Sequence, residues 1–381
     1  MSSRPLRIAL VAGETSGDIL GAAFIEALRG QHPAVEFMGM AGPRMRTMGC
    51  RTIASADELA VMGLFEVVSH LPRLLRLRRR LTAAIRAWQP DVFVGVDAPS
   101  FNLGLAATLK QAGLRTVQYV SPQLWAWRPG RVRHMHRASD LVLCLLPFEP
   151  GFYQGHGVRA EFVGHPLADQ IPLESRRVNA RTALGLAPDA EVLALLPGSR
   201  RGEIQRMAPA FLAAARLLRA GRPALQIVVP MVSELIRADF QRAGAMPEGM
   251  HLLDGNARLA LQAADAALVT SGTATLESLL CGCPLVAAYR FNALTALLLK
   301  ITRMAQVPYF SLPNLLAGKR LVPEIFQDAV TGPVLAAAVR GQLDLGDARA
   351  PMLAEFSAIH RQLRVGGAER AAAAVLRLVT A

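Results

Sequence analysis

An aspartate at the end of an apolar run is the first residue in this sequence with the type and position to do chemistry. Asp97 directly follows the strand-like run Asp91–Val96. A carboxylate is costly to bury there without a partner or a task, and it can accept the proton of an attacking hydroxyl group. The alternative is a helix cap for Ser100–Thr108. Asp97 is therefore a candidate general base.

A glycine-containing turn, Gly13–Asp18, directly follows the run Leu6–Ala12 and opens a helix. Glycines permit a tight turn, and the amides at a helix N-terminus can face an anion or a sugar hydroxyl. The turn does not match G-x-G-x-x-G, so a nicotinamide-binding fingerprint is not supported. A plain strand-to-helix turn capped by Thr15 or Ser16 is the alternative.

A third loop combines a glycine turn, a hydroxyl and two arginines at a helix N-terminus, after the run Glu191–Leu196. Backbone amides, the helix dipole and fixed positive charge all favour a diphosphate at such a place. A bland surface turn is the alternative. The residues that we expect to bind the diphosphate are Gly198, Ser199, Arg200 and Arg201.

A fourth loop follows the run Ala266–Thr270 with three small residues, Ser271, Gly272 and Thr273, before another helix begins. Its amides can hold phosphate. Glu277, in the early turns of that helix, can accept hydrogen bonds from two ribose hydroxyls. A capping box is the alternative interpretation.

The sequence offers no pattern that is typical of a metal site. There is no D-x-D motif, so we expect the diphosphate to be neutralised by arginines and amides, with no metal and no cofactor. His134 and His136 lie in a basic run, which favours a solvated helix face. The cysteines complete no zinc set, and we expect all of them to be small buried hydrophobic residues: Cys50, Cys144, Cys281 and Cys283.

An amphipathic, arginine-rich segment spans residues 61–88. At 100° per residue, its apolar side chains from Leu74 to Trp88 form one narrow stripe, and most of its arginines lie off that stripe. Such a helix can lie on an anionic membrane; a helix packed on its own sheet is the alternative. The residues that we expect to contact a membrane are Val61, Met62, Leu64, Phe65, Arg73, Arg76, Arg79 and Arg80.

The elements that must position these residues alternate between strand and helix. Apolar runs of about five residues recur, separated by helical patterns, and the rhythm restarts near Glu191. Continuous apolar runs are typical of parallel strands that are covered on both faces. We therefore predict α/β architecture: two Rossmann-like, doubly wound parallel-sheet domains facing a cleft, at 1–170 and 171–350. Two C-terminal helices, 351–381, either cross back onto the first half or exchange with a second subunit in a homodimer.

Composition narrows the class of protein. The 381 residues are 52 % hydrophobic and 19 % charged, and the net charge is +13. This balance favours polyanions such as nucleotide phosphates, nucleic acid or anionic lipid. No apolar run reaches about 18 residues, and the N-terminus shows no signal-peptide pattern. We expect a protein of the reducing cytoplasm.

Eight motifs, in order and covering nearly the whole chain, resemble those of bacterial lipid-A-disaccharide synthases. The two longest, SPQLWAWRPGR and SLPNLLAGKRLVPEIFQ, are also the most distinctive. The motifs are GETSGD (13–18), VMGLFEV (61–67), VGVDAPSFN (94–102), SPQLWAWRPGR (121–131), FVGHPLAD (162–169), LLPGSRRGEI (195–204), TSGTATLE (270–277) and SLPNLLAGKRLVPEIFQ (311–327).

The resemblance implies an inverting glycosyltransferase of the GT-B type. Its donor would be UDP-2,3-diacylglucosamine and its acceptor 2,3-diacylglucosamine 1-phosphate, known as lipid X. The products would be the β-1,6-linked lipid A disaccharide 1-phosphate and UDP. Both substrates are lipids, so the resemblance also implies a peripheral location on the cytoplasmic face of the inner membrane.

On this resemblance the candidate residues receive roles. Asp97 would take the proton from the acceptor 6-hydroxyl, with Glu14 as the reserve base. Ser16 and Gly17 would orient the sugars, and Asn314 would face the cleft on resemblance alone. The two phosphate-type loops would stabilise the charge that develops on UDP.

Three other classes of protein compete with this one. A UDP-N-acetylglucosamine 2-epimerase would need no lipid acceptor and would leave the segment 61–80 unexplained. The glycosyltransferase of the peptidoglycan lipid precursor is disfavoured by SPQLWAWRPGR and GETSGD. A nucleic-acid-binding protein would suit the charge, but the sequence has no recognition helix, aromatic sheet or zinc module, so we expect no nucleic-acid partner.

Overall fold

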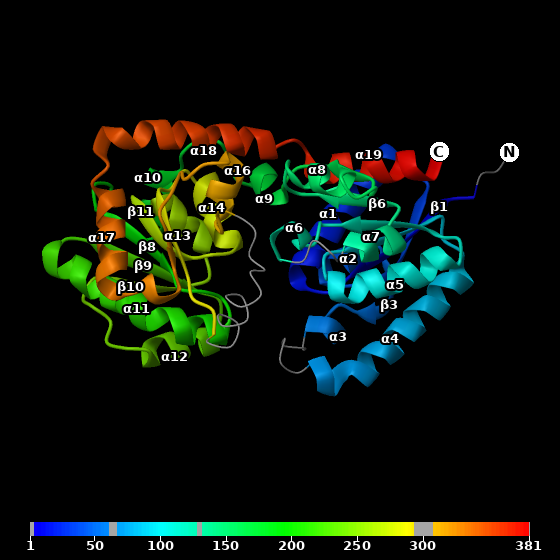
Figure 1. Ribbon diagram of the computed structural model, residues 1–381, viewed down its shortest axis with the longest axis horizontal. Coiled ribbons are helices and arrows are strands. Elements are labelled where there is room, and N and C mark those ends of the chain that lie inside the picture. The colour runs from blue at the N-terminus through cyan, green and yellow to red at the C-terminus, as the bar shows by residue number, and fades with distance from the viewer. Residues whose placement is uncertain (1–3, 61–66, 128–131, 293–307, 381) are drawn as a thin grey trace. The chain divides into compact units, whose positions relative to one another are not determined.

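The computed structural model describes residues 4–60, 67–127, 132–292 and 308–380 (Figure 1). The chain forms two compact units. Unit 1 consists of Met1–Asp169 and Leu363–Ala381, and unit 2 consists of Gln170–Gln362. Each unit is built around its own parallel sheet with helices packed on it, so the predicted fold class is confirmed.

The sheet of unit 1 has seven parallel strands in the order β3-β2-β1-β4-β5-β6-β7. The strand order reverses between β1 and β4, and the ligands of open α/β sheets bind beyond the carboxyl ends of the strands at such a switch point. The strands are β1 (Leu6–Ala12), β2 (Val35–Ala41), β3 (Arg51–Ser55), β4 (Val92–Val96), β5 (Arg115–Tyr119), β6 (Leu141–Cys144) and β7 (Ala160–Phe162).

Helices cover both faces of this sheet. Successive side chains of a strand point to opposite faces, and along β1 Ile8 and Leu10 belong to one buried cluster while Ala9 and Val11 belong to another. Residues of α1 and α19 complete the first cluster, and residues of α4 and α5 complete the second. The helices of unit 1 are α1 (Thr15–Gln31), α2 (Pro43–Thr47), α3 (Asp57–Ala60), α4 (Val67–Trp88), α5 (Pro99–Gln111), α6 (Leu124–Trp127), α7 (Val132–Ala138), α8 (Glu149–Gln154), α9 (Pro166–Gln170) and α19 (Gly367–Thr380).

Unit 2 repeats the plan with six parallel strands in the order β10-β9-β8-β11-β12-β13, and its switch point lies between β8 and β11. Helices α11 and α17 pack on one face around Phe211 and Leu335. The strands are β8 (Val192–Leu196), β9 (Gln226–Met231), β10 (Met250–Asp254), β11 (Ala266–Thr270), β12 (Leu285–Tyr289) and β13 (Glu324–Phe326). The helices are α10 (Arg177–Ala183), α11 (Arg201–Gly221), α12 (Glu234–Arg242), α13 (Ala257–Ala263), α14 (Thr273–Leu280), α16 (Leu312–Ala317), α17 (Gly332–Leu343) and α18 (Ala350–Leu363), with 3-10 turns η2 (Gln327–Ala329) and η3 (Gly346–Arg349).

The last helix, α19, returns to unit 1 and packs against α1. Helix α18 ends at Leu363 and α19 begins at Gly367, so two C-terminal helices form as predicted, and Gly366 between them has a φ of +72°. Asp169 accepts hydrogen bonds from the amides of Gly366 (3.1 Å) and Gly367 (2.7 Å). A carboxylate at a helix N-terminus is stabilised by the helix dipole, so Asp169 holds the start of α19 in place.

Strands β1 and β11 match the predicted apolar runs, and β4 and β8 each begin one residue after theirs. Three strands were not predicted: β3, β7 and β13. Each of them lies at an edge of its sheet. An edge strand pairs on one side only and buries less apolar surface, so it lacks the continuous apolar run by which the inner strands were recognised.

Candidate active site

All four candidate loops leave the carboxyl ends of strands that flank a switch point. In unit 1, loop 13–18 follows β1 and loop 97–102 follows β4, and these two strands pair with each other. In unit 2, loop 197–203 follows β8 and loop 271–277 follows β11, which also pair. The structure therefore brings the loops together in twos, at the place in each sheet where ligands bind.

Close packing joins the two loops of unit 1. A Cβ added to Gly13 would lie 2.8 Å from the Cβ of Ala98, so a larger residue would push the loops apart. The hydroxyl of Ser16 donates a hydrogen bond to Oδ2 of Asp97 at 3.4 Å. Ser16 and Glu14 are both exposed. The predicted site residues Glu14, Ser16 and Asp97 are thus at least partly accessible to solvent on these two loops.

The rest of the GETSGD turn is structural. Gly17 is buried, and a Cβ on it would lie 3.3 Å from the Cβ of Ala12, so it can reach a sugar only through its backbone. Asp18 is also buried, and its carboxylate accepts the amides of Arg44 (2.9 Å) and Met45 (3.0 Å) at the start of α2. The sequence did not reveal this role of Asp18, because its partners are distant along the chain.

The backbone of Asp97 is held in an uncommon conformation. Asp97 and Ala98 have φ values of +52° and +42°, in the left-handed region that aspartate tolerates better than most residues. The buried amide of Asn102 donates to the carbonyl of Asp97 at 2.8 Å and to carbonyls at the ends of β1 and β4. The side chain of Gln118 donates to the same Asp97 carbonyl at 3.1 Å. Asn102 and Gln118 thereby fix the main chain from which the Asp97 carboxylate projects.

The alternative interpretation of Asp97 as a helix cap is not supported. Helix α5 begins at Pro99 and its N-cap residue is Ala98, with no side-chain capping bond. The Asp97 carboxylate is only partly buried, so it retains hydrogen-bonding capacity beyond the one bond from Ser16. This geometry suits a group that accepts a proton from a bound hydroxyl.

The loop after β8 differs from the predicted anion site in one respect. The carboxylate of Glu203 accepts the amides of Ser199 (3.1 Å) and Arg200 (3.4 Å), so these amides already have an acceptor. Gly198 makes this possible: its φ is +127°, and a Cβ on it would lie 2.7 Å from the Cβ of Glu203. The amides of Glu203 and Ile204 donate to the Arg200 carbonyl at 2.9 and 3.0 Å. The amides of Arg201 and Gly202, at the start of α11, remain suited to an anion.

The two arginines of this loop have different surroundings. Arg201 donates from Nε to Oδ2 of Asp239 at 2.6 Å, and Arg242 lies 2.8 Å from the other oxygen of the same carboxylate. Arg200 is 80 % exposed, and within the described part of the chain its ion pair is a 3.4 Å contact with Glu203. Arg200 is therefore the cation of this loop that is free to meet a diphosphate.

The loop after β11 opens directly into α14. Gly272 and Thr273 are exposed, and Ser271 donates to the carbonyl of Phe310 at 3.1 Å. The predicted alternative, a capping box, does not form, because Glu277 instead lies 3.6 Å from Nε of Arg258. Burial raises the pKa of Glu277 above its ordinary value, and Arg258 opposes this shift. Because Glu277 does not cap α14 and its ion pair with Arg258 is long, its carboxylate can still accept hydrogen bonds from ribose hydroxyls.

Asn314 was expected to face a substrate, but the structure places it in the interior of unit 2. Its side chain is fully buried; Oδ1 accepts the amides of Leu321 (2.7 Å) and Val322 (2.8 Å), and Nδ2 donates to the Val322 carbonyl at 3.0 Å. These bonds leave little capacity for a substrate. Asn314 closes the loop between α16 and β13, and we assign it that supporting role rather than direct contact with substrate.

Glu324, which the sequence analysis did not single out, has a related role. It accepts the amides of Phe310 and Ser311 and the hydroxyl of Ser311, the last at 2.6 Å. Because Phe310 in turn accepts the hydroxyl of Ser271, Glu324 supports the candidate phosphate loop from behind. The distinctive motif 311–327 is thus a scaffold for residues 271–275.

Helix α4 decides between the two interpretations of the amphipathic segment. Leu77, Leu81 and Ile85 are buried in the second core cluster of unit 1, so the apolar stripe packs on its own sheet. Arg73, Arg76 and Arg79 are exposed, and Arg80 pairs with Glu58 at 3.0 Å. The predicted contacts Val61, Met62, Leu64 and Phe65 lie outside the described residues.

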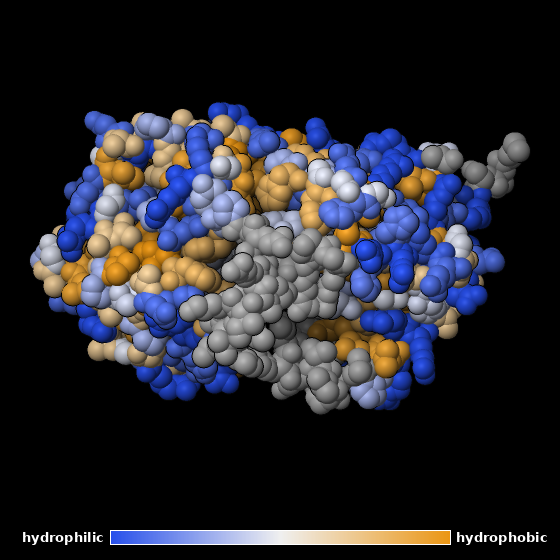
Figure 2. All heavy atoms as spheres, viewed as in Figure 1, coloured by the Kyte–Doolittle hydropathy of each residue, from blue (hydrophilic) through white to orange (hydrophobic). Residues whose placement is uncertain are grey.

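On the face shown in Figure 2, hydrophobic patches of the described residues alternate with hydrophilic ones. Among the described residues, no helix combines the length and the apolar character needed to cross a bilayer.

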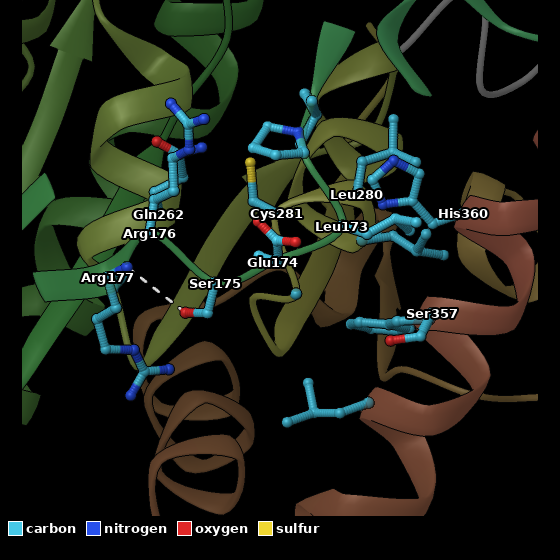
Figure 3. A pocket seen from close by; sticks show the side chains of 17 residues that line it. Leu173, Glu174, Ser175, Arg176, Arg177, Gln262, Leu280, Cys281, Ser357 and His360 are labelled. Carbon is cyan, nitrogen blue, oxygen red and sulfur yellow. Dashed lines mark hydrogen bonds between the residues drawn. The ribbon is translucent and has the colours of Figure 1, made fainter. Parts of the chain in front are cut away.

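A pocket of about 200 Å³ in unit 2 lies away from the candidate loops (Figure 3). It is lined by residues 171–177, by the end of α14 and by α18. In Figure 3, Arg176 and Gln262 lie on one side of it, His360 and Ser357 on the other, and Cys281 between them. The C-terminus of α14 is at the amino end of the strands, so this pocket is at the edge opposite to the one where nucleotides bind.

The described residues contain no group of three or more His, Cys, Asp or Glu side chains that could hold a metal ion. All four cysteines are free thiols; Cys50, Cys144 and Cys283 are buried, as predicted, whereas Cys281 is partly exposed. Burial raises the pKa of the Cys50 and Cys281 thiols to about 12, so both stay protonated near neutral pH.

A family model described as lipid-A-disaccharide synthetase matches residues 8–374 of this chain. The lipid-A-disaccharide synthase of Sodalis glossinidius is 51 % identical over 384 residues, which cover 100 % of both chains. The chain belongs to the lipid-A-disaccharide synthase family. The family indicated by the eight motifs is therefore confirmed.

Solved structures of more distant proteins share the fold. The calicheamicin glycosyltransferase CalG4 has a TM-score of 0.59 and 18 % identity, covering 98 % of each chain. The UDP-GlcNAc 2-epimerase from Neisseria meningitidis, bound to UDP-GlcNAc, has a TM-score of 0.67 and 13 % identity, covering 97 % of this chain and 99 % of the other. At such low identity these likenesses show the fold alone, which is that of GT-B enzymes.

Proposed function

We propose that this protein joins UDP-2,3-diacylglucosamine to 2,3-diacylglucosamine 1-phosphate and releases UDP, with inversion at the anomeric carbon. The observation that carries the proposal is the 51 % identity over the whole chain to a lipid-A-disaccharide synthase. The product is the β-1,6-linked lipid A disaccharide 1-phosphate.

In this mechanism, unit 1 supplies the base and unit 2 supplies the nucleotide site. Asp97 takes the proton of the acceptor 6-hydroxyl as the oxygen attacks the anomeric carbon, and Ser16 orients the Asp97 carboxylate. The bond from the anomeric carbon to the UDP oxygen breaks, and Arg200 stabilises the charge that develops on the diphosphate. Glu277 binds the ribose hydroxyls.

The first experiment tests the reaction itself. The purified protein is incubated with both lipid substrates in detergent micelles with EDTA, and the disaccharide is detected by mass spectrometry. We expect the disaccharide and one equivalent of UDP, without added metal, because arginines and amides serve the diphosphate. Tight UDP binding with no disaccharide would contradict the proposal and favour another UDP-sugar enzyme of the same fold.

We further propose that the protein is peripheral on the cytoplasmic face of the inner membrane, with α4 toward the lipid. Arg73, Arg76 and Arg79 are exposed on α4 and follow residues 61–66 in the sequence. Basic residues near an anionic surface contribute about 1 kcal/mol each.

Changing Arg73, Arg76 and Arg79 together to glutamine is therefore expected to weaken binding to phosphatidylglycerol vesicles roughly a hundredfold. Vesicle sedimentation at two salt concentrations measures this, and the loss should shrink in high salt. The matched control changes Arg320, Arg361 and Arg370, which are also exposed, and removes the same charge. Equal losses in both variants would show a non-specific charge effect and overturn the placement of α4. Binding to duplex DNA as tight as to vesicles would favour the nucleic-acid alternative.

A further inference from the structure

A buried carboxylate in unit 1 has no part in the mechanism above. Glu149 is the first residue of α8, next to the carboxyl end of β6, and only 3 % of it is exposed. Oε1 accepts the indole N–H of Trp125 at 3.1 Å, and Oε2 accepts the amide of Leu146 at 3.0 Å. None of the ion pairs among the described residues involves Glu149, and in this part of the chain hydrogen bonds compensate its charge.

One partner of Glu149, Trp125, belongs to the segment that follows β5. Trp125 packs edge-on against Phe148, with ring centroids 4.9 Å apart and an interplanar angle of 88°. The hydroxyl of Ser121 lies 2.9 Å from the hydroxyl of Tyr153 on α8. The segment Ser121–Trp125 is therefore held in place by contacts with Phe148, Glu149 and Tyr153.

Hydrogen bonds connect the residues that precede this segment to the candidate base, Asp97. The amide of Asp97 donates to the carbonyl of Tyr119 at 2.8 Å. Gln118 donates both to the Asp97 carbonyl (3.1 Å) and to the Val120 carbonyl (3.3 Å). Val120 has a φ of +78°, a strained conformation for a β-branched residue. Strain of this kind persists only where the surrounding structure holds it, and it is common at functional sites.

We propose that Glu149 is a positioning residue whose ionised carboxylate fixes Ser121–Trp125 as a wall of the acceptor site beside Asp97, so that acceptor binding weakens when Glu149 takes up a proton. This inference rests on the proposed function. It identifies no new reacting group, because Glu149 is buried and acts through Trp125 and Ser121.

The chemistry of the carboxyl group gives the reason. The ionised form has acceptor oxygens only, and the Trp125 and Leu146 N–H groups both donate to it. The protonated form places an O–H on one oxygen, where it faces a donor, so one hydrogen bond is lost. An unmade bond at a buried polar group is costly, and we expect the segment to shift in order to relieve it.

The proton exchanges in the physiological range. Burial raises the pKa of Glu149 to about 7, against hydrogen bonds from Leu146, Trp125, Ser121 and Leu145 that lower it. Among the described residues, the titratable neighbours of Glu149 are Cys144 and Tyr153, and burial raises the pKa of both far enough that they stay neutral. The folded protein thus binds this proton more tightly than the unfolded chain, so ionisation of Glu149 destabilises the fold as pH rises toward 7.

The test uses Glu149→Gln, which keeps the shape and, like the protonated acid, places a donor group at one of the two oxygen positions and an acceptor at the other. We expect its KM for the acceptor at pH 8 to be about tenfold above that of the wild type, with kcat within twofold. In the wild type this KM should rise as pH falls from 8 to 6, whereas the variant should lack that part of the pH dependence. The acceptor phosphate also titrates near pH 6, and it does so equally in both proteins.

Glu36→Gln is the matched control, because Glu36 is an exposed glutamate of the same unit that pairs with Arg7 at 3.4 Å. It should match the wild type. Trp125→Phe removes the donor to Glu149 and should raise the acceptor KM, and adding it to Glu149→Gln should cost little more. Identical pH profiles for wild type and Glu149→Gln, or a fall in kcat with an unchanged KM, would overturn the proposal.

A readout independent of activity separates this inference from the proposed function. Tryptophan fluorescence of the wild type should change with a midpoint near pH 7, and the change should be absent from both Glu149→Gln and Trp125→Phe. If the fluorescence changes in this way but no disaccharide forms, the proposed function is wrong, and the pH-dependent interaction of Glu149 with Trp125 is supported. If the disaccharide forms and no variant alters the fluorescence step, the inference fails alone.

Discussion

Replacing Asp97 with asparagine is expected to lower kcat roughly a thousandfold, because a positioned general base contributes about 10²- to 10⁴-fold to catalysis. Asparagine is the informative substitution. It tolerates the left-handed backbone that Asp97 adopts at φ +52°, so the turn and the bonds from Asn102 and Gln118 persist. Alanine would strain the same turn and confound the loss of the base.

Single-turnover kinetics with both substrates saturating measure this effect. The KM values should change little, since the amide still accepts the hydrogen bond from Ser16. Glu14→Gln is the matched control: Glu14 is the exposed reserve base on the neighbouring loop, and we expect its variant to keep most of the activity. Near-full turnover by Asp97→Asn, with collapse in Glu14→Gln, would assign the base to Glu14.

Replacing Arg200 with alanine is expected to lower kcat by about 10²- to 10³-fold, the range found when one group that stabilises developing charge is removed. Arg200 is an exposed cation of the loop after β8, and among the described residues its ion pair is with Glu203 at 3.4 Å. The diphosphate carries more negative charge as the glycosidic bond breaks, so the loss should fall on kcat more than on the KM for the donor.

Arg201 provides the matched control for this prediction. It is adjacent in sequence and equally charged, but Asp239 holds its guanidinium at 2.6 Å. We expect Arg201→Ala to reduce kcat by less than about tenfold, because the Arg201 guanidinium already pairs with the Asp239 carboxylate. Isothermal titration with UDP would complement the kinetics. Equal losses of kcat in the two variants would mean that the loop binds the diphosphate with both arginines or with neither.

Much of this protein follows from patterns that are local in the sequence. Apolar runs of five residues predicted the inner strands, since a parallel strand that is covered on both faces must be apolar throughout. The same runs located the four loops, because polar residues that follow a buried strand are exposed at its carboxyl end. Asp97, Arg200 and Glu277 were identified in this way, and the distinctive motifs indicated the family.

Tertiary structure alone decided which of these groups are available for chemistry. Arg200 and Arg201 are equivalent in the sequence, and only the position of Asp239 on α12 distinguishes them. Asn314 was expected to meet a substrate, but its hydrogen bonds to Leu321 and Val322 occupy it. From the sequence, the apolar stripe of α4 could face either a membrane or a core. In the structure it packs on the sheet of unit 1.

The supporting acids Asp18, Glu149 and Glu324 were missed for the same reason. A carboxylate in the sequence shows its charge but not its hydrogen-bond donors, and these donors come from segments that meet only in the folded chain. The sequence by itself determined the order of strands and helices and the types of residue at the ends of the strands, because burial and backbone conformation select residues locally. Only the fold decided which polar groups satisfy one another and which remain open to a substrate, because hydrogen bonds and ion pairs depend on distance in space rather than along the chain.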